Sequence, residues 1–211
     1  MESLQPYRVA GRCGHRAEPC PVSKPSIGRQ AGFTIVELVT VLVVISIMTT
    51  VVIPGMIDMV RNNRQSTVLN ALTHSFYIAR SEAISRAQGV SICPTVNFTS
   101  CAGSTAWEKG WLVFTDQDRD GVIDTGKDAV LRVFNAVNGG SDLTAASRIT
   151  YSPIGTVQSG AGVATLCDSR GAGHARGIKL LATGFVDILG DTDDNGIIDD
   201  GASSPTDLSC S

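Results

Sequence analysis

The pattern of apolar residues separates one long continuous run from the rest of the chain. Between Phe33 and Ile53 the sequence holds a single charged residue, Glu37, among residues that are otherwise apolar or carry a hydroxyl. At about 1.5 Å per residue, a helix over this run would be about 30 Å long, the thickness of a bilayer's hydrocarbon core. We therefore predict a transmembrane helix over residues 33–53.

A periodic apolar pattern follows this run. Seven residues recur at the spacing of one helical face: Val68, Leu69, Leu72, Phe76, Ala79, Ala83 and Ala87. Such a stripe is typical of an amphipathic helix that packs on a core, and Gly89 is a natural stop. Pro54 removes a backbone donor and Gly55 loosens the chain, so we expect a kink or local melting at Pro54, not an end. Residues 54–88 are predicted to be the second half of the same helix.

Short β-like runs replace the helical period from residue 89 onward. Glycine, proline, asparagine and aspartate turns bound seven of them, at 90–93, 111–115, 129–134, 148–152, 163–167, 177–182 and 185–189. Runs of this length between turn residues predict an antiparallel sheet. We expect an α+β fold in which the long N-terminal helix packs, through its amphipathic half, on a β-rich domain of residues 89–211.

The first 32 residues are basic and lack an apolar core of their own. They hold five Lys and Arg against two acids, whereas residues 33–211 hold twelve basic and eighteen acidic residues, a net charge of −6. The positive-inside rule places the N-terminus in the cytoplasm and the β-rich domain across the membrane. A secretory signal peptide and an uncleaved anchor are the alternatives. The apolar run is longer than a signal-peptide core, and no A-x-A-like site ends it.

Glu37 is unusual because it lies inside the apolar run. A carboxylate in a membrane helix costs about 2.5–3.5 kcal/mol at the bilayer centre and less near an end, and it marks a functional position. If the chain is cut after Gly32, the new α-amino group of Phe33 lies about one helical turn from Glu37. In an assembly, that amine can pair with Glu37 of a neighbouring subunit.

The string from Gly32 to Leu38, GFTIVEL, resembles the class III signal of type IV pilins and pseudopilins, and Pro54 stands at position 22 counted from Phe33. The resemblance implies cleavage between Gly32 and Phe33 by a prepilin peptidase, which removes residues 1–32, and N-methylation of Phe33. It further implies polymerisation with other pilins or pseudopilins through the N-terminal helix, with Glu37 guiding subunit register. The leader is longer than most, which leaves the true start codon open.

Three downstream segments narrow the resemblance. They are 107–116 (WEKGWLVFTD), 152–155 (SPIG) and 166–171 (LCDSRG), which resemble the minor pilin and pseudopilin H branch, the FimT/GspH family. The resemblance covers most of residues 33–186. It implies a structural subunit of the inner membrane that enters a type IV pilus or a type II secretion pseudopilus at or near the tip. The two machines stay open alternatives, with a slight preference for a pilus.

Four cysteines remain after the expected cleavage: Cys93, Cys101, Cys167 and Cys210. In an oxidising periplasm an even number suggests two disulfides, for which four cysteines allow three connectivities. Cys93 with Cys101 is favoured because the two flank a short proline-containing loop, which leaves Cys167 with Cys210. A metal site is the alternative, although no CxxC motif or nearby histidine supports it.

Two loops repeat the pattern D-x-D-x-[D/N]-G-x-I-D, at 116–124 and 191–199. Oxygen side chains at positions 1, 3, 5 and 9 with glycine at position 6 are what an EF-hand-like loop offers Ca²⁺. These candidate ligands are Asp116, Asp118, Asp120 and Asp124 in the first loop, and Asp191, Asp193, Asn195 and Asp199 in the second. Position 12 holds Lys127 and Ala202, so we expect Asp128 and Asp200 to substitute for the missing acid. Plain Asp/Gly-rich turns are the alternative.

No motif suggests catalysis or a required cofactor, so Ca²⁺ is the one candidate ligand and we expect no enzyme activity. DNA binding in natural transformation is the alternative function, because some minor pilins of the FimT branch bind DNA. That resemblance requires a basic G-R-x-R motif, whereas residues 182–186 (ATGFV) lack arginine. The nearest basic residues are Arg170, Arg176 and Lys179, and an acidic tail follows them. Because neutralisation of phosphates supplies most of a protein's affinity for DNA, we do not expect DNA as a partner.

Overall fold

The computed structural model describes residues 32–137 and 139–210. The expected leader, apart from Gly32, therefore lies outside the described residues. Helix α1 spans Ile35–Ile47, the π-helical turn η1 spans Met48–Val52, and helix α2 spans Ile53–Arg86, one directly after another. By its contacts the chain divides between Thr50 and Val51 into two units. The first contains α1 and the second contains α2 and all the strands.

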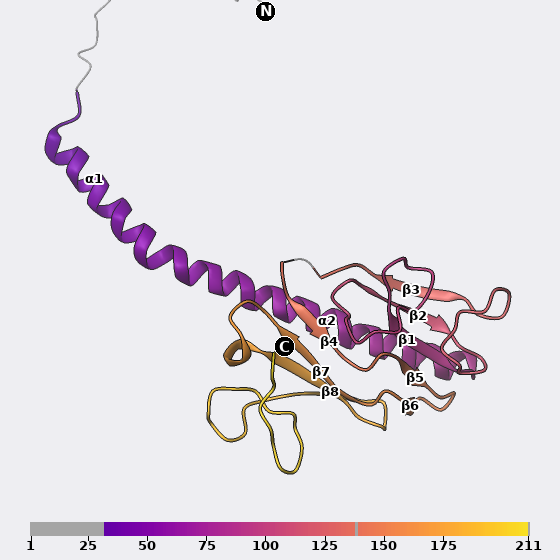
Figure 1. The fold of residues 1–211 in the computed structure, drawn as a ribbon. Coiled ribbons are helices and arrows are strands. Elements are labelled where there is room, and N and C mark those ends of the chain that lie inside the picture. Colours follow the sequence, from indigo (N-terminus) through magenta and orange to yellow (C-terminus); the bar gives the residue numbers. More distant parts are fainter. Residues whose placement is uncertain (1–31, 138, 211) are drawn as a thin grey trace, which may run out of the picture. The chain divides into compact units, whose positions relative to one another are not determined.

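The second unit has an α+β fold with two antiparallel sheets (Figure 1). The five-stranded sheet has the order β3-β2-β1-β5-β6, and the four-stranded sheet has the order β4-β7-β8-β9. The strands are β1 (Val90–Pro94), β2 (Trp111–Thr115), β3 (Val130–Phe134), β4 (Asp142–Thr144), β5 (Ile149–Tyr151), β6 (Val157–Ser159), β7 (Gly162–Cys167), β8 (Arg176–Leu180) and β9 (Val186–Ile188). A short 3₁₀ turn, η2 (Ala172–His174), precedes β8.

Helix α2 joins the two sheets through one core. Its buried stripe consists of six of the seven residues predicted from the period: Val68, Leu69, Leu72, Phe76, Ala79 and Ala83. The helix contacts β1, β2 and β5 of one sheet and β8 of the other (Figure 1). The fold class is therefore confirmed, with α2 as the helix that packs on the sheets.

The end of α2 differs from the prediction at Gly89. Ala87 is the left-handed residue, with φ of 53°, and it is exposed. The N–H groups of Ala87 and Gln88 donate to the carbonyls of Ile84 and Ala83, which is a Schellman ending. Gly89 instead permits a close approach, because a Cβ there would lie 2.2 Å from the Asp116 carbonyl oxygen.

The two central strands, β1 and β2, are buried along their whole length. One face lies against α2, and the other is covered by a small cluster in which Cys101 and Ile123 pack on Leu112 and Phe114. Because both faces are covered, these strands show continuous apolar runs and little alternation.

Candidate functional site

The first candidate site is the apolar helix that begins after Gly32. Thr34 is the N-cap of α1, and its hydroxyl accepts a hydrogen bond from the Glu37 N–H at 3.2 Å. None of the residues of α1 is buried, and Phe33 is 85% exposed. Within the described residues, the helix from Ile35 to Arg86 is the one long and apolar enough to cross a membrane. The segment thus presents an uncovered apolar surface that needs lipid or other helices around it.

Polar side chains within this helix are arranged for an apolar environment. Thr40, Ser46, Thr49 and Thr50 each donate their hydroxyl hydrogen to a backbone carbonyl one turn earlier. Such bonds satisfy hydroxyl groups without water. Glu37, which is exposed, is the single charged residue between Phe33 and Ile53.

The helix continues through Pro54. The π-helical turn η1 ends at Val52, and Pro54 lies in the first turn of α2. Single π-helical turns inside α-helices are rare, and both they and proline are recognised causes of helix kinks. The local irregularity lies directly before Pro54, and the kink there stays an expectation.

The first Asp-rich loop places three of its four predicted ligands together. Carboxylate oxygens of Asp116, Asp118 and Asp120 lie within 4.8 Å of one another, whereas Asp124 is outside this group. The ammonium of Lys127 lies 3.0 Å from Asp124 Oδ2 and 3.9 Å from Asp118 Oδ2. The hydrogen bond that Lys127 donates to Asp124, together with the charges of both carboxylates, raises the pKa of Lys127. A cation of the protein therefore already pairs with this loop.

The second Asp-rich loop likewise gathers Asp191, Asp193 and Asp199, whose oxygens lie within 4.8 Å of one another. Asn195, the fourth predicted ligand, instead donates its side-chain N–H groups to Asp193 at 3.1 Å and to Asp207 at 2.9 Å.

Asp128 and Asp200, the expected replacements for the acid at position 12, lie outside the two groups of neighbouring carboxylate oxygens. The Asp128 carboxylate accepts hydrogen bonds from the N–H groups of Gln117 and Asp124. The Asp200 carboxylate accepts bonds from Ala202 and Thr206, which hold the pKa of Asp200 below its usual range. Both carboxylates therefore hold loop backbone in place.

The structure joins Cys93 to Cys101 and Cys167 to Cys210, the same two pairs that the sequence favoured. The first bridge closes the loop that covers β1. The second ties the C-terminal segment to β7 beside a small cluster of Ala175, Leu189 and Leu208. The acidic C-terminal segment is thus anchored at its far end.

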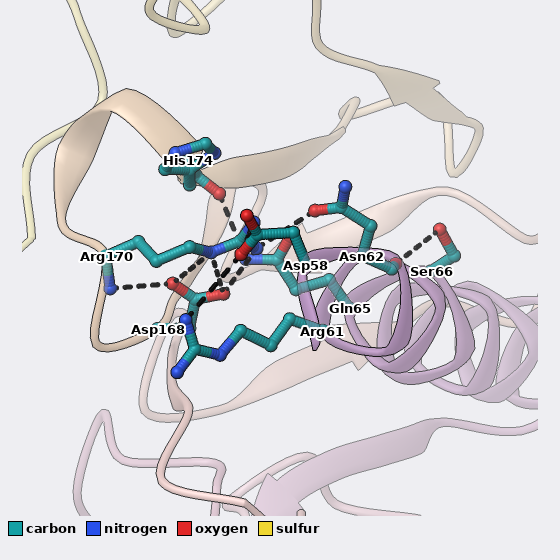
Figure 2. Close-up of polar contacts among 8 residues, drawn as sticks. All are labelled: Asp58, Arg61, Asn62, Gln65, Ser66, Asp168, Arg170 and His174. Carbon is teal, nitrogen blue, oxygen red and sulfur yellow. Dashed lines mark hydrogen bonds and ion pairs between the residues drawn. The ribbon is translucent and has the colours of Figure 1, made fainter. Parts of the chain in front are cut away.

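A polar cluster that the sequence did not reveal joins α2 to the turn after β7 (Figure 2). The guanidinium of Arg170 donates to the Asp168 carboxylate at 2.7–3.2 Å and to the Asn62 side-chain oxygen at 2.9 Å. Asp58 lies 3.7 Å from the same guanidinium. The side chains of Arg170 and Asp168 are only 10% and 7% exposed. Hydrogen bonding to Arg170 lowers the pKa of Asp168 and raises that of Arg170.

This cluster includes Arg170, one of the three basic residues that the sequence offered as DNA contacts. The side chain of Arg170 is largely covered and pairs with the carboxylates of Asp168 and Asp58, so its guanidinium is not free to bind a phosphate. Lys179 donates its ammonium hydrogen to the Gly201 carbonyl at 2.7 Å, and Arg176 is exposed. The three residues therefore do not form a free basic patch.

Comparisons with known proteins place the chain in a family. A crystal structure of the type IV minor pilin FimU from Pseudomonas aeruginosa is similar at 21% identity over 62% of this chain and 90% of that one, with a TM-score of 0.45. A second crystal form of FimU gives 19% identity, 59% and 92% coverage and a TM-score of 0.43. No curated protein matches. The family model described as type II transport protein GspH matches residues 68–184. Because this match covers more than half of the sequence, the chain belongs to the GspH family of minor pilins and pseudopilins.

Proposed function

We propose that this chain is a structural subunit at or near the tip of a type IV pilus or a type II secretion pseudopilus, where it helps assembly. The carrying observation is the string from Gly32 to Leu38 followed by a helix whose apolar surface is uncovered. Cleavage between Gly32 and Phe33 and N-methylation of Phe33, by a prepilin peptidase and methyltransferase, would convert the inserted precursor into the assembling form.

The proposed topology follows from charge and cysteine chemistry. The basic leader stays in the cytoplasm, α1 crosses the inner membrane once, and the β-rich domain lies in the periplasm. Both disulfides are in this domain, which suits an oxidising compartment. The role is structural and not enzymatic, and it requires no cofactor. An ion held by an Asp-rich loop would act on the stability of the domain.

Assembly exchanges one apolar environment for another. On extraction from the membrane, α1 loses its lipid contacts and gains contacts with equivalent helices of other subunits. Glu37 directs this exchange, because its carboxylate can pair with the α-amino group of a neighbouring chain that begins at Phe33. An unpaired carboxylate in the filament core would be costly, which selects the correct register.

Substitution of Glu37 by alanine tests this role. The variant should be processed and inserted like the wild type but recovered far less in sheared filaments, because its register signal is lost. Thr40→Ala is the matched control, since Thr40 lies one turn away and donates only to the Glu37 carbonyl at 2.9 Å. Normal incorporation of Glu37→Ala would refute the register role.

Deletion of the gene distinguishes the two machines. Loss of twitching with normal exoprotein release would assign the subunit to a pilus, and loss of exoprotein release alone would assign it to a secretion system. DNA binding is the alternative function. It is disfavoured because Arg170 is occupied by carboxylates and because residues 180–211 hold seven aspartates and no lysine or arginine.

A further inference from the structure

The second Asp-rich loop contains buried carboxylate oxygens that have no partner in the described part of the chain. Asp199 is 1% exposed, and its Oδ1 atom accepts no hydrogen bond. The Oδ1 atom of Asp191 is likewise buried and unpartnered. Buried charged oxygens are normally satisfied, because an unpaired one retains the full cost of leaving water. These two atoms are therefore available to a cation. Asp116 Oδ1 in the first loop is buried and unpartnered in the same way, so the choice between the loops rests on the charges around them.

The other oxygen of each carboxylate holds the loop in place. Asp191 Oδ2 accepts from the Gly196 N–H at 2.7 Å, and Asp199 Oδ2 accepts from the Thr192 N–H at 2.7 Å. Each side chain is thus fixed by one oxygen and leaves the second one free. A loop that is already ordered in this way loses little entropy when it binds an ion.

The distances suit a calcium ion. Two oxygens on opposite sides of Ca²⁺, at bond lengths of about 2.4 Å, lie about 4.8 Å apart. Oxygens of Asp191, Asp193 and Asp199 all lie within 4.8 Å of one another. The carbonyl of Ile197 stands at position 7, from which EF-hand loops supply a backbone ligand.

The local charge favours a dication. Residues 180–211 hold seven aspartates and no lysine or arginine. The nearest preceding cation in the sequence, Lys179, uses its ammonium on the Gly201 carbonyl. In the first loop, by contrast, Lys127 lies 3.0 Å from Asp124 and 3.9 Å from Asp118, so an incoming ion would have to displace it.

We propose that residues 191–199 form a Ca²⁺ site with Asp191, Asp193 and Asp199 as side-chain ligands. The loop at 116–124 does not bind the ion under this proposal. The site lacks the bidentate acid at position 12, so waters complete the shell and the affinity is that of extracellular modules, about 0.1–1 mM. The ion would hold the acidic segment between Leu189 and Leu208, which already pack in one small cluster. This inference does not depend on the assembly role.

Calorimetric titration of the detergent-solubilised full chain with CaCl₂, after removal of divalent ions, tests the site. The wild type should bind one Ca²⁺ per chain. Asp193→Asn should weaken binding on the order of tenfold, because it removes one of three charged ligands. Asp193 is exposed, so this variant should keep the circular dichroism spectrum of the wild type.

Asp118→Asn is the matched control, since Asp118 holds the same position in the first loop, and it should bind Ca²⁺ like the wild type. Calcium should also raise the unfolding temperature of the wild type more than magnesium does, because Mg²⁺ keeps its waters and demands shorter bonds. Absence of heat up to about 10 mM Ca²⁺, well above the expected affinity range, would overturn the proposal. Binding that is lost in Asp118→Asn but kept in Asp193→Asn would overturn the choice of loop.

Discussion

Replacement of Arg170 by methionine should destabilise the β-rich domain by about 3 kcal/mol. Breaking a buried ion pair from one side costs about 3–5 kcal/mol, because a buried charge is left without its partner. Arg170 and Asp168 are 10% and 7% exposed, so solvent screens their interaction little. We take the lower end of the range because the backbone N–H at position 170 still donates to Asp168 Oδ1 at 2.9 Å.

An exposed ion pair provides the control. Arg86 Nε lies 2.6 Å from Glu82 Oε2, a shorter contact than any that Arg170 makes, yet these side chains are 46% and 34% exposed. Helix-surface pairs of this kind contribute about 0.3–0.5 kcal/mol. Arg86→Met should therefore cost several-fold less than Arg170→Met, because burial and not distance decides the energy.

Urea unfolding followed by tryptophan fluorescence measures both variants. Trp107 and Trp111 are buried in the core of the domain and are the only two tryptophans in the chain, so the signal reports this domain. With a slope of about 1–3 kcal/mol per molar urea, a loss of about 3 kcal/mol moves the midpoint down by about 1–3 M. A midpoint for Arg170→Met that equals that of Arg86→Met would refute the reasoning.

Two further predictions concern the same domain. The Arg170 guanidinium holds the pKa of Asp168 in the folded protein below its ordinary value of 3.8. The stability that the ionised Asp168 carboxylate adds is therefore complete above the ordinary pKa and is lost as the pH falls through the lower pKa of the folded state. The difference in unfolding free energy between wild type and Asp168→Asn should thus be constant near neutral pH and shrink in acid; a gap that widens in acid would contradict this. Gly89→Ala should cost about 1–3 kcal/mol in urea unfolding, because its Cβ would lie 2.2 Å from the Asp116 carbonyl oxygen. Gly173→Ala meets no atom within 4 Å and should be near neutral, so equal effects of the two would be evidence against the close approach.

Local patterns in the sequence predict most of the elements. The seven β-like runs all correspond to strands, because each is bounded by turn residues and carries its own apolar signal. Strands β4 and β6 were missed, since Asp142–Thr144 and Val157–Ser159 have three residues each and little apolar content. Their pairing with β7 and β5 supplies what the local sequence lacks.

The polar cluster could not be predicted for a different reason. Asn62 and Arg170 are 108 residues apart in the sequence, and only the packing of α2 beside the turn after β7 brings them together. The Asp-rich loops were visible in the sequence because their spacing is local. What the spacing could not show is that Lys127 pairs with Asp124 and Asp118 of the first loop. Buried carboxylate oxygens without a hydrogen bond occur in both loops, at Asp116 in the first and at Asp191 and Asp199 in the second.

Mass spectrometry of sheared filaments tests the central claim, that the chain is cut after Gly32 and assembled through its N-terminal helix. The account predicts that the filament fraction contains this chain beginning at Phe33, with one methyl group on its α-amino nitrogen. It also predicts that Glu37→Ala yields the same processed chain in the membrane fraction but little in the filaments. A chain that keeps residues 1–32 and is absent from filaments would contradict the account.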